Sequence, residues 1–189
     1  MRIVGGRFRG TRLASVGTGD AAAHLRPTSD RVREAIFNLL QNGGYGDPVA
    51  DARVLDLFAG TGALGLEALS RGAAFVLFVD DGVKARALVR QNIDLLHAIG
   101  PTKLFRRDAT RLGPARGLPF DLVFLDPPYG KGLGPTALAS ARSGGWLQDH
   151  ALIVWEDGSE QAPVPGFEML DARRYGETWV HILRAQAAV

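Results

Sequence analysis

A glycine-rich turn, Gly60-Thr61-Gly62-Ala63-Leu64-Gly65, begins just after the predicted strand at residues 54–58 and opens a helical pattern at residues 63–70. Glycines at such a turn let the backbone bend tightly and come close to a ligand. A strand, a glycine turn and a helix form the first half of a βαβ unit. The turn therefore predicts an α/β fold with a ligand site at the end of this strand.

The alternation of strands and helices continues along the chain. Further strands are predicted at residues 75–79, 103–106, 118–125 and 151–155, and helices at residues 83–99 and 136–143. The last two runs, 167–174 and 178–184, flank Tyr175-Gly176-Glu177 with no helical stretch between them. We predict a mostly parallel seven-stranded sheet with helices on both faces and a C-terminal antiparallel hairpin.

The N-terminal segment has a different character. Residues 2–13 predict a small β-hairpin with arginines on its exposed side, followed by a Gly/Ala/Thr/Ser loop to residue 25. A helix is then predicted from the capping residues Thr28-Ser29-Asp30 to Asn42-Gly43-Gly44. We therefore expect an N-terminal extension over residues 1–25 and a Rossmann-like domain over residues 26–189.

Charge is concentrated in the same segment. The first 33 residues hold seven arginines against two aspartates, although the net charge of the whole chain is only +2. Clustered guanidinium groups suit phosphate contacts, and a solvated arm is the alternative interpretation.

Composition excludes several classes of site. The chain has no cysteine, and its four histidines show no paired ligand spacing, so we expect no metal. The longest apolar stretch, residues 73–79, is too short to cross a bilayer, and no signal segment opens the chain. We expect a cytoplasmic protein with no membrane partner.

A second motif, Asp126-Pro127-Pro128-Tyr129, follows the apolar run at residues 122–125. Two prolines supply no backbone N–H, which leaves a stiff turn with outward carbonyl oxygens. Asp126 adds an acceptor and Tyr129 a flat face, so the motif suits a planar amine that is held by acceptors and stacked on a ring. A Pro-rich loop without a ligand is the alternative.

Acidic residues at strand ends suggest which cofactor the glycine turn takes. Asp56 lies inside the first strand, four residues before Gly60, where its carboxylate would repel a diphosphate and attract an ammonium or sulfonium group. S-adenosylmethionine carries both cations and no phosphate. Asp80 can accept from ribose hydroxyls, and Asp108-Ala109 can meet the adenine. Helix N-caps are the alternative role for these aspartates.

The residues Asp56 to Ala73, with Asp126-Pro127-Pro128-Tyr129 downstream, resemble the RsmD family of 16S ribosomal RNA guanine-N2 methyltransferases. The resemblance extends upstream to Arg2-Ile3-Val4-Gly5-Gly6, Arg9-Gly10 and the run Arg26 to Asn38. It implies a class I methyltransferase fold, S-adenosylmethionine as donor, a guanine amino group as acceptor and an N-terminal hairpin that recognises RNA. We expect the partner to be 16S ribosomal RNA or a small-subunit assembly particle, and the chain to be a monomer.

The residue arguments and the resemblance together give a predicted site. The predicted catalytic residues are Asp126, Pro127, Pro128 and Tyr129. The predicted cofactor-binding residues are Thr28, Asp56, Phe58, Ala59, Gly60, Thr61, Gly62, Asp80, Asp108, Ala109 and Asp126. The predicted RNA-binding residues are Arg2, Arg7, Arg9, Arg12 and Arg31. Family members usually have glutamate at the ribose position, where this chain has Asp80 followed by Asp81, so Asp81 is the alternative there.

Other functions share parts of this pattern. The Asp-Pro-Pro-Tyr turn also occurs in adenine-N6 DNA methyltransferases and, as an Asn variant, in protein glutamine methyltransferases. The arginines favour a nucleic acid over a protein acceptor, and the chain has no sizeable segment for recognising a DNA site. A nicotinamide-dependent oxidoreductase is disfavoured by Asp56. A noncatalytic RNA-binding module would need the arginines but not the Asp-Pro-Pro-Tyr turn.

Overall fold

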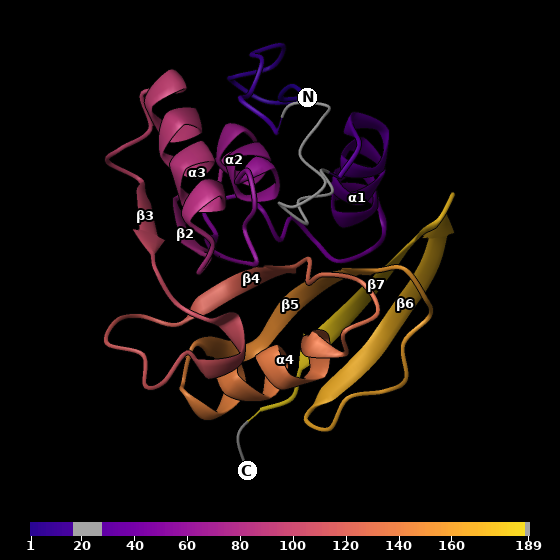
Figure 1. Ribbon diagram of the computed structural model, residues 1–189. Helices are drawn as coiled ribbons and strands as arrows, with labels where there is room; N and C mark the ends of the chain where they lie inside the picture. Colours follow the sequence, from indigo (N-terminus) through magenta and orange to yellow (C-terminus); the bar gives the residue numbers. More distant parts are fainter. Residues whose placement is uncertain (17–27, 188–189) are drawn as a thin grey trace.

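The computed structural model describes residues 1–16 and 28–187, which form a seven-stranded sheet in the order β3-β2-β1-β4-β5-β7-β6 (Figure 1). The strands are β1 (Arg53–Leu57), β2 (Phe75–Val79), β3 (Thr102–Phe105), β4 (Phe120–Leu125), β5 (Leu147–Asp157), β6 (Phe167–Tyr175) and β7 (Thr178–Ala185). β1 to β5 pair in parallel, and β7 lies antiparallel between β5 and β6. The predicted mostly parallel sheet with a terminal hairpin is confirmed.

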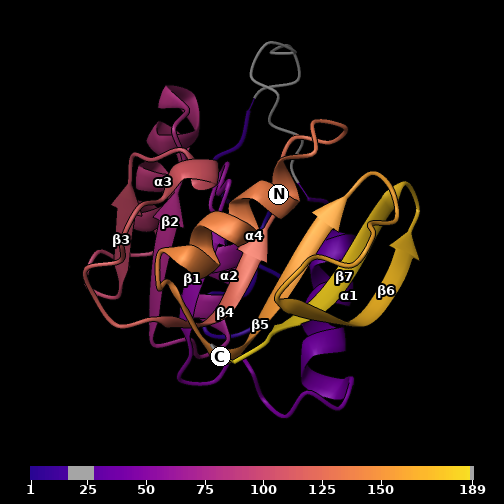
Figure 2. The same ribbon diagram turned by 90° about the horizontal axis from the view of Figure 1, so that it is seen from below.

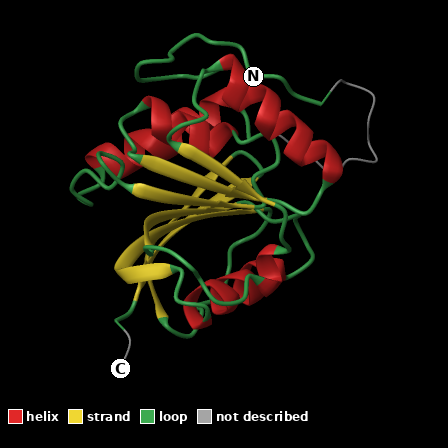
Figure 3. Cartoon of the chain, turned by 90° about the vertical axis from the view of Figure 1, so that its left-hand side faces the viewer, coloured by secondary structure: helices red, strands yellow, loops and turns green. Residues whose placement is uncertain are grey.

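Helices cover both faces of this sheet (Figure 3). The helices α1 (Asp30–Asn42), α2 (Ala63–Ser70) and α3 (Val83–Leu95) pack on one face. The helix α4 (Leu133–Ser143) and the 3₁₀ helix η2 (Ala109–Arg111) pack on the other, toward the viewer in Figure 2.

The alternation of side chains along β1 explains the two layers. Val54 belongs to the core under α1 to α3, whereas Leu55 and Leu57 belong to the core under α4. Because successive side chains of a strand point to opposite faces, Asp56 faces α2. The end of β1 therefore delivers one carboxylate to the helix that follows the glycine turn.

Several element boundaries differ from the sequence prediction. The helix α3 ends at Leu95 rather than residue 99, because His97 adopts a left-handed φ of 50° and turns the chain. The helix α4 begins at Leu133, three residues earlier than predicted, since proline is tolerated in a first turn. The strand β5 runs on to Asp157, which pairs with Trp179 of β7.

The N-terminal extension makes less β-structure than predicted. Its two arms meet in one antiparallel bridge, Arg2 to Arg12, and do not form continuous strands. The amides of Val4 and Gly5 instead donate to the two carboxylate oxygens of Glu67 on α2, at 2.8 and 2.7 Å. The extension is therefore folded onto α2. The predicted loop and the predicted boundary at residue 25 fall largely on residues 17–27, outside the described residues.

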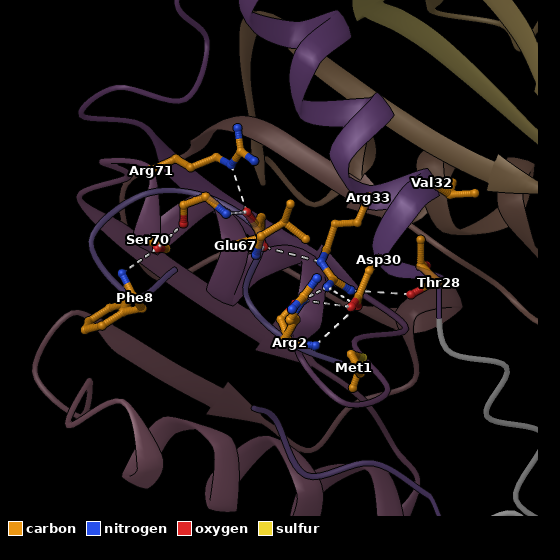
Figure 4. Close-up of polar contacts among 12 residues, drawn as sticks. Met1, Arg2, Phe8, Thr28, Asp30, Val32, Arg33, Glu67, Ser70 and Arg71 are labelled. Carbon is orange, nitrogen blue, oxygen red and sulfur yellow. Dashed lines mark hydrogen bonds and ion pairs between the residues drawn. The ribbon is translucent and has the colours of Figure 1, made fainter. Parts of the chain in front are cut away.

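A buried ion pair lies beneath the extension (Figure 4). Arg33 of α1 and Glu67 of α2 are both fully buried, with Nε of Arg33 3.4 Å from Oε2 of Glu67. Arg33 also donates to the carbonyl of Arg2 and, at 2.7 Å, to Asp30. Arg33 is one of the seven N-terminal arginines of the sequence, and here it has a structural role.

Candidate active site

A cleft of about 570 Å³ opens at the carboxyl ends of β1, β2 and β4. Parallel α/β sheets bind their ligands at this edge. The cleft brings together eleven of the predicted site residues, namely Thr28, Asp56, Phe58, Ala59, Gly60, Thr61, Asp80, Asp126, Pro127, Pro128 and Tyr129. The glycine turn and the Asp-Pro-Pro-Tyr turn, 66 residues apart in sequence, therefore share one cavity.

The glycine turn has the backbone conformation that its sequence predicts. Gly60 and Gly62 have φ angles of 60° and 77°, in the left-handed region that glycine adopts without strain. Phe58 also lies there, with φ of 57°, so an ordinary residue is held in a sparsely populated conformation at the cleft. Gly62 is the N-cap of α2, which places the start of this helix at the cavity.

Gly65 allows α2 to approach the sheet closely. A Cβ atom on Gly65 would lie 2.5 Å from Phe78 and 2.9 Å from the carboxylate of Asp56. The Gly65 amide donates to that carboxylate at 3.0 Å. Only 1% of Asp56 is exposed, and its burial raises the pKa well above the ordinary value, with further increases from Asp126 and Asp80.

Asp80 fixes the ends of β1 and β2 relative to each other. Its carboxylate accepts from the amides of Gly60 and Gly82, at 2.9 and 2.8 Å. Burial nevertheless raises the pKa of Asp80, because it outweighs the effect of these two hydrogen bonds. Asp81, the alternative ribose ligand, also lines the cleft but is exposed.

Asp126 begins the Asp-Pro-Pro-Tyr turn and shares the hydroxyl of Thr28 with Glu156, which was not among the predicted site residues. The hydroxyl oxygen of Thr28 lies 3.4 Å from Oδ2 of Asp126 and 3.1 Å from Oε1 of Glu156. Burial raises the pKa of Asp126 to about 7. The hydrogen bond from Thr28 lowers this pKa, and the charge of Asp157 raises it further. Glu156 follows the apolar run 151–155, and this position at a predicted strand end is the sequence signal that could have identified it as a site residue.

Tyr129 closes the turn beside the C-terminal hairpin. Its hydroxyl lies 3.4 Å from the hydroxyl of Thr178 at the start of β7. A Cβ atom on Gly158 would lie 2.9 Å from the Tyr129 ring, so the missing side chain of Gly158 leaves room for it. The ring is partly exposed at the cleft, as stacking on a planar ligand would require.

Three predicted cofactor residues lie outside the lining of the cleft. Gly62 is one of them; it follows the lining residue Thr61 in sequence and caps α2. Asp108 caps η2 instead, where it accepts from the hydroxyl and the amide of Thr110 at 2.7 and 2.8 Å. These hydrogen bonds lower its pKa. Ala109 is buried in the core beneath α4.

The predicted RNA-binding arginines are exposed. Arg2, Arg7, Arg9 and Arg12 lie on the N-terminal extension, and Arg31 lies on α1. Arg2 is 3.7 Å from the carboxylate of Asp30, and Arg7 lies over the ring of Phe8. The extension packs on α2, where the amides of Arg7 and Phe8 donate to Ser70 at the end of this helix.

Metal-ligand clusters and membrane-spanning helices are both absent from residues 1–16 and 28–187. No three His, Asp or Glu side chains among residues 1–16 and 28–187 are grouped as a metal site would require. Within the same residues, no helix is long and apolar enough to cross a membrane.

Sequence comparison identifies the relatives of this chain. A family described as conserved hypothetical protein 95 matches residues 1–184. The ribosomal RNA small subunit methyltransferase D of Escherichia coli K12 is 40% identical over 161 residues, which cover 85% of this chain and 76% of the relative. The putative rRNA methyltransferase YlbH of Bacillus subtilis is 36% identical over 97% of this chain and 98% of its own.

Structure comparison agrees with the sequence comparison. The structure described as putative methyltransferase yhhF from Escherichia coli superimposes with a TM-score of 0.81 and 34% identity, covering 100% of this chain and 99% of the other. The seven-stranded sheet found here is therefore the methyltransferase fold that the resemblance implied.

Proposed function

The chain belongs to the conserved hypothetical protein 95 family, the RsmD family of small-subunit ribosomal RNA methyltransferases, and we propose that it methylates the exocyclic N2 amino group of a guanine in 16S ribosomal RNA. The methyl donor in this proposal is S-adenosylmethionine. The observation that carries the proposal is the meeting of the glycine turn and the Asp-Pro-Pro-Tyr turn in one cleft.

The residues of the cleft fit this donor. Four carboxylates line the cavity, from Asp56, Asp80, Asp81 and Asp126, against the two cations Lys84 and Lys131. A diphosphate would face these acids at the start of α2, whereas an ammonium and a sulfonium group are attracted to them. Asp80 would accept from the ribose hydroxyls, with Thr61 and the glycine turn against the amino acid part. Bound there, S-adenosylmethionine supplies an electrophilic methyl group.

The Asp-Pro-Pro-Tyr turn would hold the acceptor. Asp126 and the carbonyl oxygen of Pro127 accept hydrogen bonds from the guanine amino group, which directs the nitrogen lone pair toward the methyl group. Tyr129 stacks on the extruded base. The nitrogen attacks in line, the carbon–sulfur bond breaks, and the amino proton leaves to Asp126 or to solvent. Catalysis then rests on positioning and on the acceptors, with no covalent enzyme intermediate.

The exposed arginines would bind the RNA backbone. Those on the N-terminal extension, together with Arg31, provide the phosphate contacts of a substrate that is 16S ribosomal RNA or a small-subunit assembly particle. In this proposal the enzyme acts as a monomer in the cytoplasm.

Calorimetry tests the donor directly. We expect S-adenosylhomocysteine to bind with 1:1 stoichiometry and NAD to show no binding under the same conditions. A Gly65→Ala variant should bind S-adenosylhomocysteine more weakly, because the added methyl group would meet Phe78 and Asp56 beside the cleft. Binding of NAD alone would contradict the proposal.

A further inference from the structure

One hydroxyl group lies between two carboxyl groups behind the Asp-Pro-Pro-Tyr turn. The Thr28 oxygen is 3.1 and 3.3 Å from the two oxygens of Glu156 and 3.4 Å from Oδ2 of Asp126. A hydroxyl has one hydrogen to donate and two lone pairs to accept with. The hydroxyl can make a hydrogen bond to both neighbours when it donates its hydrogen to one carboxylate and accepts a hydrogen from the other carboxyl group, which is then protonated.

The surroundings indicate which carboxyl keeps the proton. Glu156 is the more deeply placed, with 1% exposed, whereas Asp126 is partly exposed at the cleft. The charged groups that act on Glu156 are Asp126, Asp56 and Arg33. Asp126 is acted on by Asp157 as well. Two acids against one cation favour a neutral Glu156.

Thr28 is itself fixed in place by the ion pair beneath the extension. Its carbonyl accepts from Nη1 of Arg33 at 3.4 Å, and Arg33 in turn pairs with Glu67. Figure 4 shows Thr28 beside Arg33 at the start of α1. The backbone of Thr28 is therefore held just before α1, and its hydroxyl lies between Asp126 and Glu156.

We propose that Glu156 is a positioning residue for methyl transfer, which keeps its proton, donates to the Thr28 oxygen and so directs the Thr28 hydroxyl hydrogen to Asp126. Once ionised, Asp126 is then oriented to accept from the guanine amino group. This inference rests on the function proposed above. In support, burial raises the pKa of Glu156 well above its ordinary value.

The arrangement implies a response to alkaline pH. When Glu156 loses its proton, its carboxylate competes for the Thr28 hydrogen from 3.1 Å, and Asp126 loses its donor. The rate of methyl transfer should therefore fall at high pH because Glu156, which does not line the cleft, loses its proton. Glu156→Gln removes this step, because an amide stays neutral and can still donate to Thr28.

Single-turnover methyl transfer, measured from pH 6 to 9.5, tests the inference. In the wild type we expect the rate to rise as Asp126 ionises and to fall by about tenfold at the alkaline end. Glu156→Gln should lose the alkaline fall. Thr28→Val should move the acid limb to higher pH by about one unit or less, since the hydrogen bond that lowers the pKa of Asp126 is gone. Thr28→Ser should restore the limb to its wild-type pH.

A second measurement does not depend on activity. The side-chain carboxyl of Glu156, identified by ¹³C NMR through its absence in Glu156→Gln, should remain protonated at pH 7. An ionised Glu156 at that pH, or an alkaline fall in Glu156→Gln equal to that of the wild type, would overturn the inference and leave the proposed function intact. A wild type that transfers no methyl group to ribosomal substrate would overturn the proposed function itself.

Discussion

The buried guanidinium of Arg33 lies 3.4 Å from the buried carboxylate of Glu67, and this pair joins α1 to α2 beneath the N-terminal extension. The same carboxylate accepts hydrogen bonds from the amides of Val4 and Gly5 and, at 2.8 Å, from Nε of Arg71. One side chain therefore fixes the extension to the helix that starts at the cleft. Removing one partner of such a pair leaves an uncompensated buried charge.

Glu67→Ala should lower the free energy of unfolding by about 3–5 kcal/mol. Urea unfolding followed by circular dichroism measures this. Glu168→Ala is the matched control, because Glu168 pairs with Arg184 at the surface at 3.9 Å and should contribute less than about 1 kcal/mol. Equal losses in the two variants would show that Glu67 does not anchor the extension.

Ionisation of Asp126 should lower stability as pH rises. In the unfolded chain this carboxyl ionises near its ordinary pKa, whereas the folded protein keeps the proton until about pH 7. Its contribution to stability is therefore present at acid pH and lost between those two values. Relative to Asp126→Asn, which has nothing to ionise, the wild type should lose unfolding free energy from pH 4 to pH 8. Parallel curves for the two proteins would contradict the raised pKa.

Replacing Arg9 and Arg12 by alanine should weaken RNA binding and reduce its dependence on salt. Each phosphate contact that is lost should lower the slope of log affinity against log salt by about 0.7 to 0.9. Binding to a 16S ribosomal RNA fragment at several salt concentrations gives the slope. A double variant at Arg173 and Arg174 removes the same charge from β6 and should keep the wild-type slope.

Tyr129→Ala should weaken the hold on the extruded base, because stacking on an aromatic ring contributes about 1–3 kcal/mol per base. The expected result is a rise in KM for RNA of roughly tenfold or more. Tyr129→Phe keeps the ring and loses the hydroxyl that lies 3.4 Å from Thr178, so its KM should stay near the wild-type value. A phenylalanine variant as impaired as the alanine variant would assign the role to the hydroxyl instead.

The sequence predicted the parts of the fold that depend on local pattern. Apolar runs located all seven strands, and glycine spacing located the turn at Gly60. The end of α3 was misplaced because the left-handed turn at His97 has no sequence signature as strong as the later Gly100-Pro101. The hairpin at residues 2–13 was overestimated because its amides bind Glu67, a contact across more than 60 residues.

The cleft was predictable where its residues follow strands and was not where it depends on packing. Asp80 and Asp126 directly follow strands of a parallel sheet and Asp56 lies near the end of β1, which brings all three to one edge. Asp108 follows the same rule and caps η2, and its contact with adenine stays a prediction. Glu156 escaped notice because its partner, Thr28, comes from a helix start 128 residues earlier.

The central claim is methyl transfer to guanine N2, and mass spectrometry of the product nucleosides tests it most directly. The protein is incubated with isotopically labelled S-adenosylmethionine and with unmodified 16S ribosomal RNA, free or in small-subunit particles, and the RNA is digested to nucleosides. The account predicts labelled N2-methylguanosine at one position with the wild type and a loss of at least about 100-fold with Asp126→Ala. Label in N6-methyladenosine, or in no nucleoside at all, would contradict it.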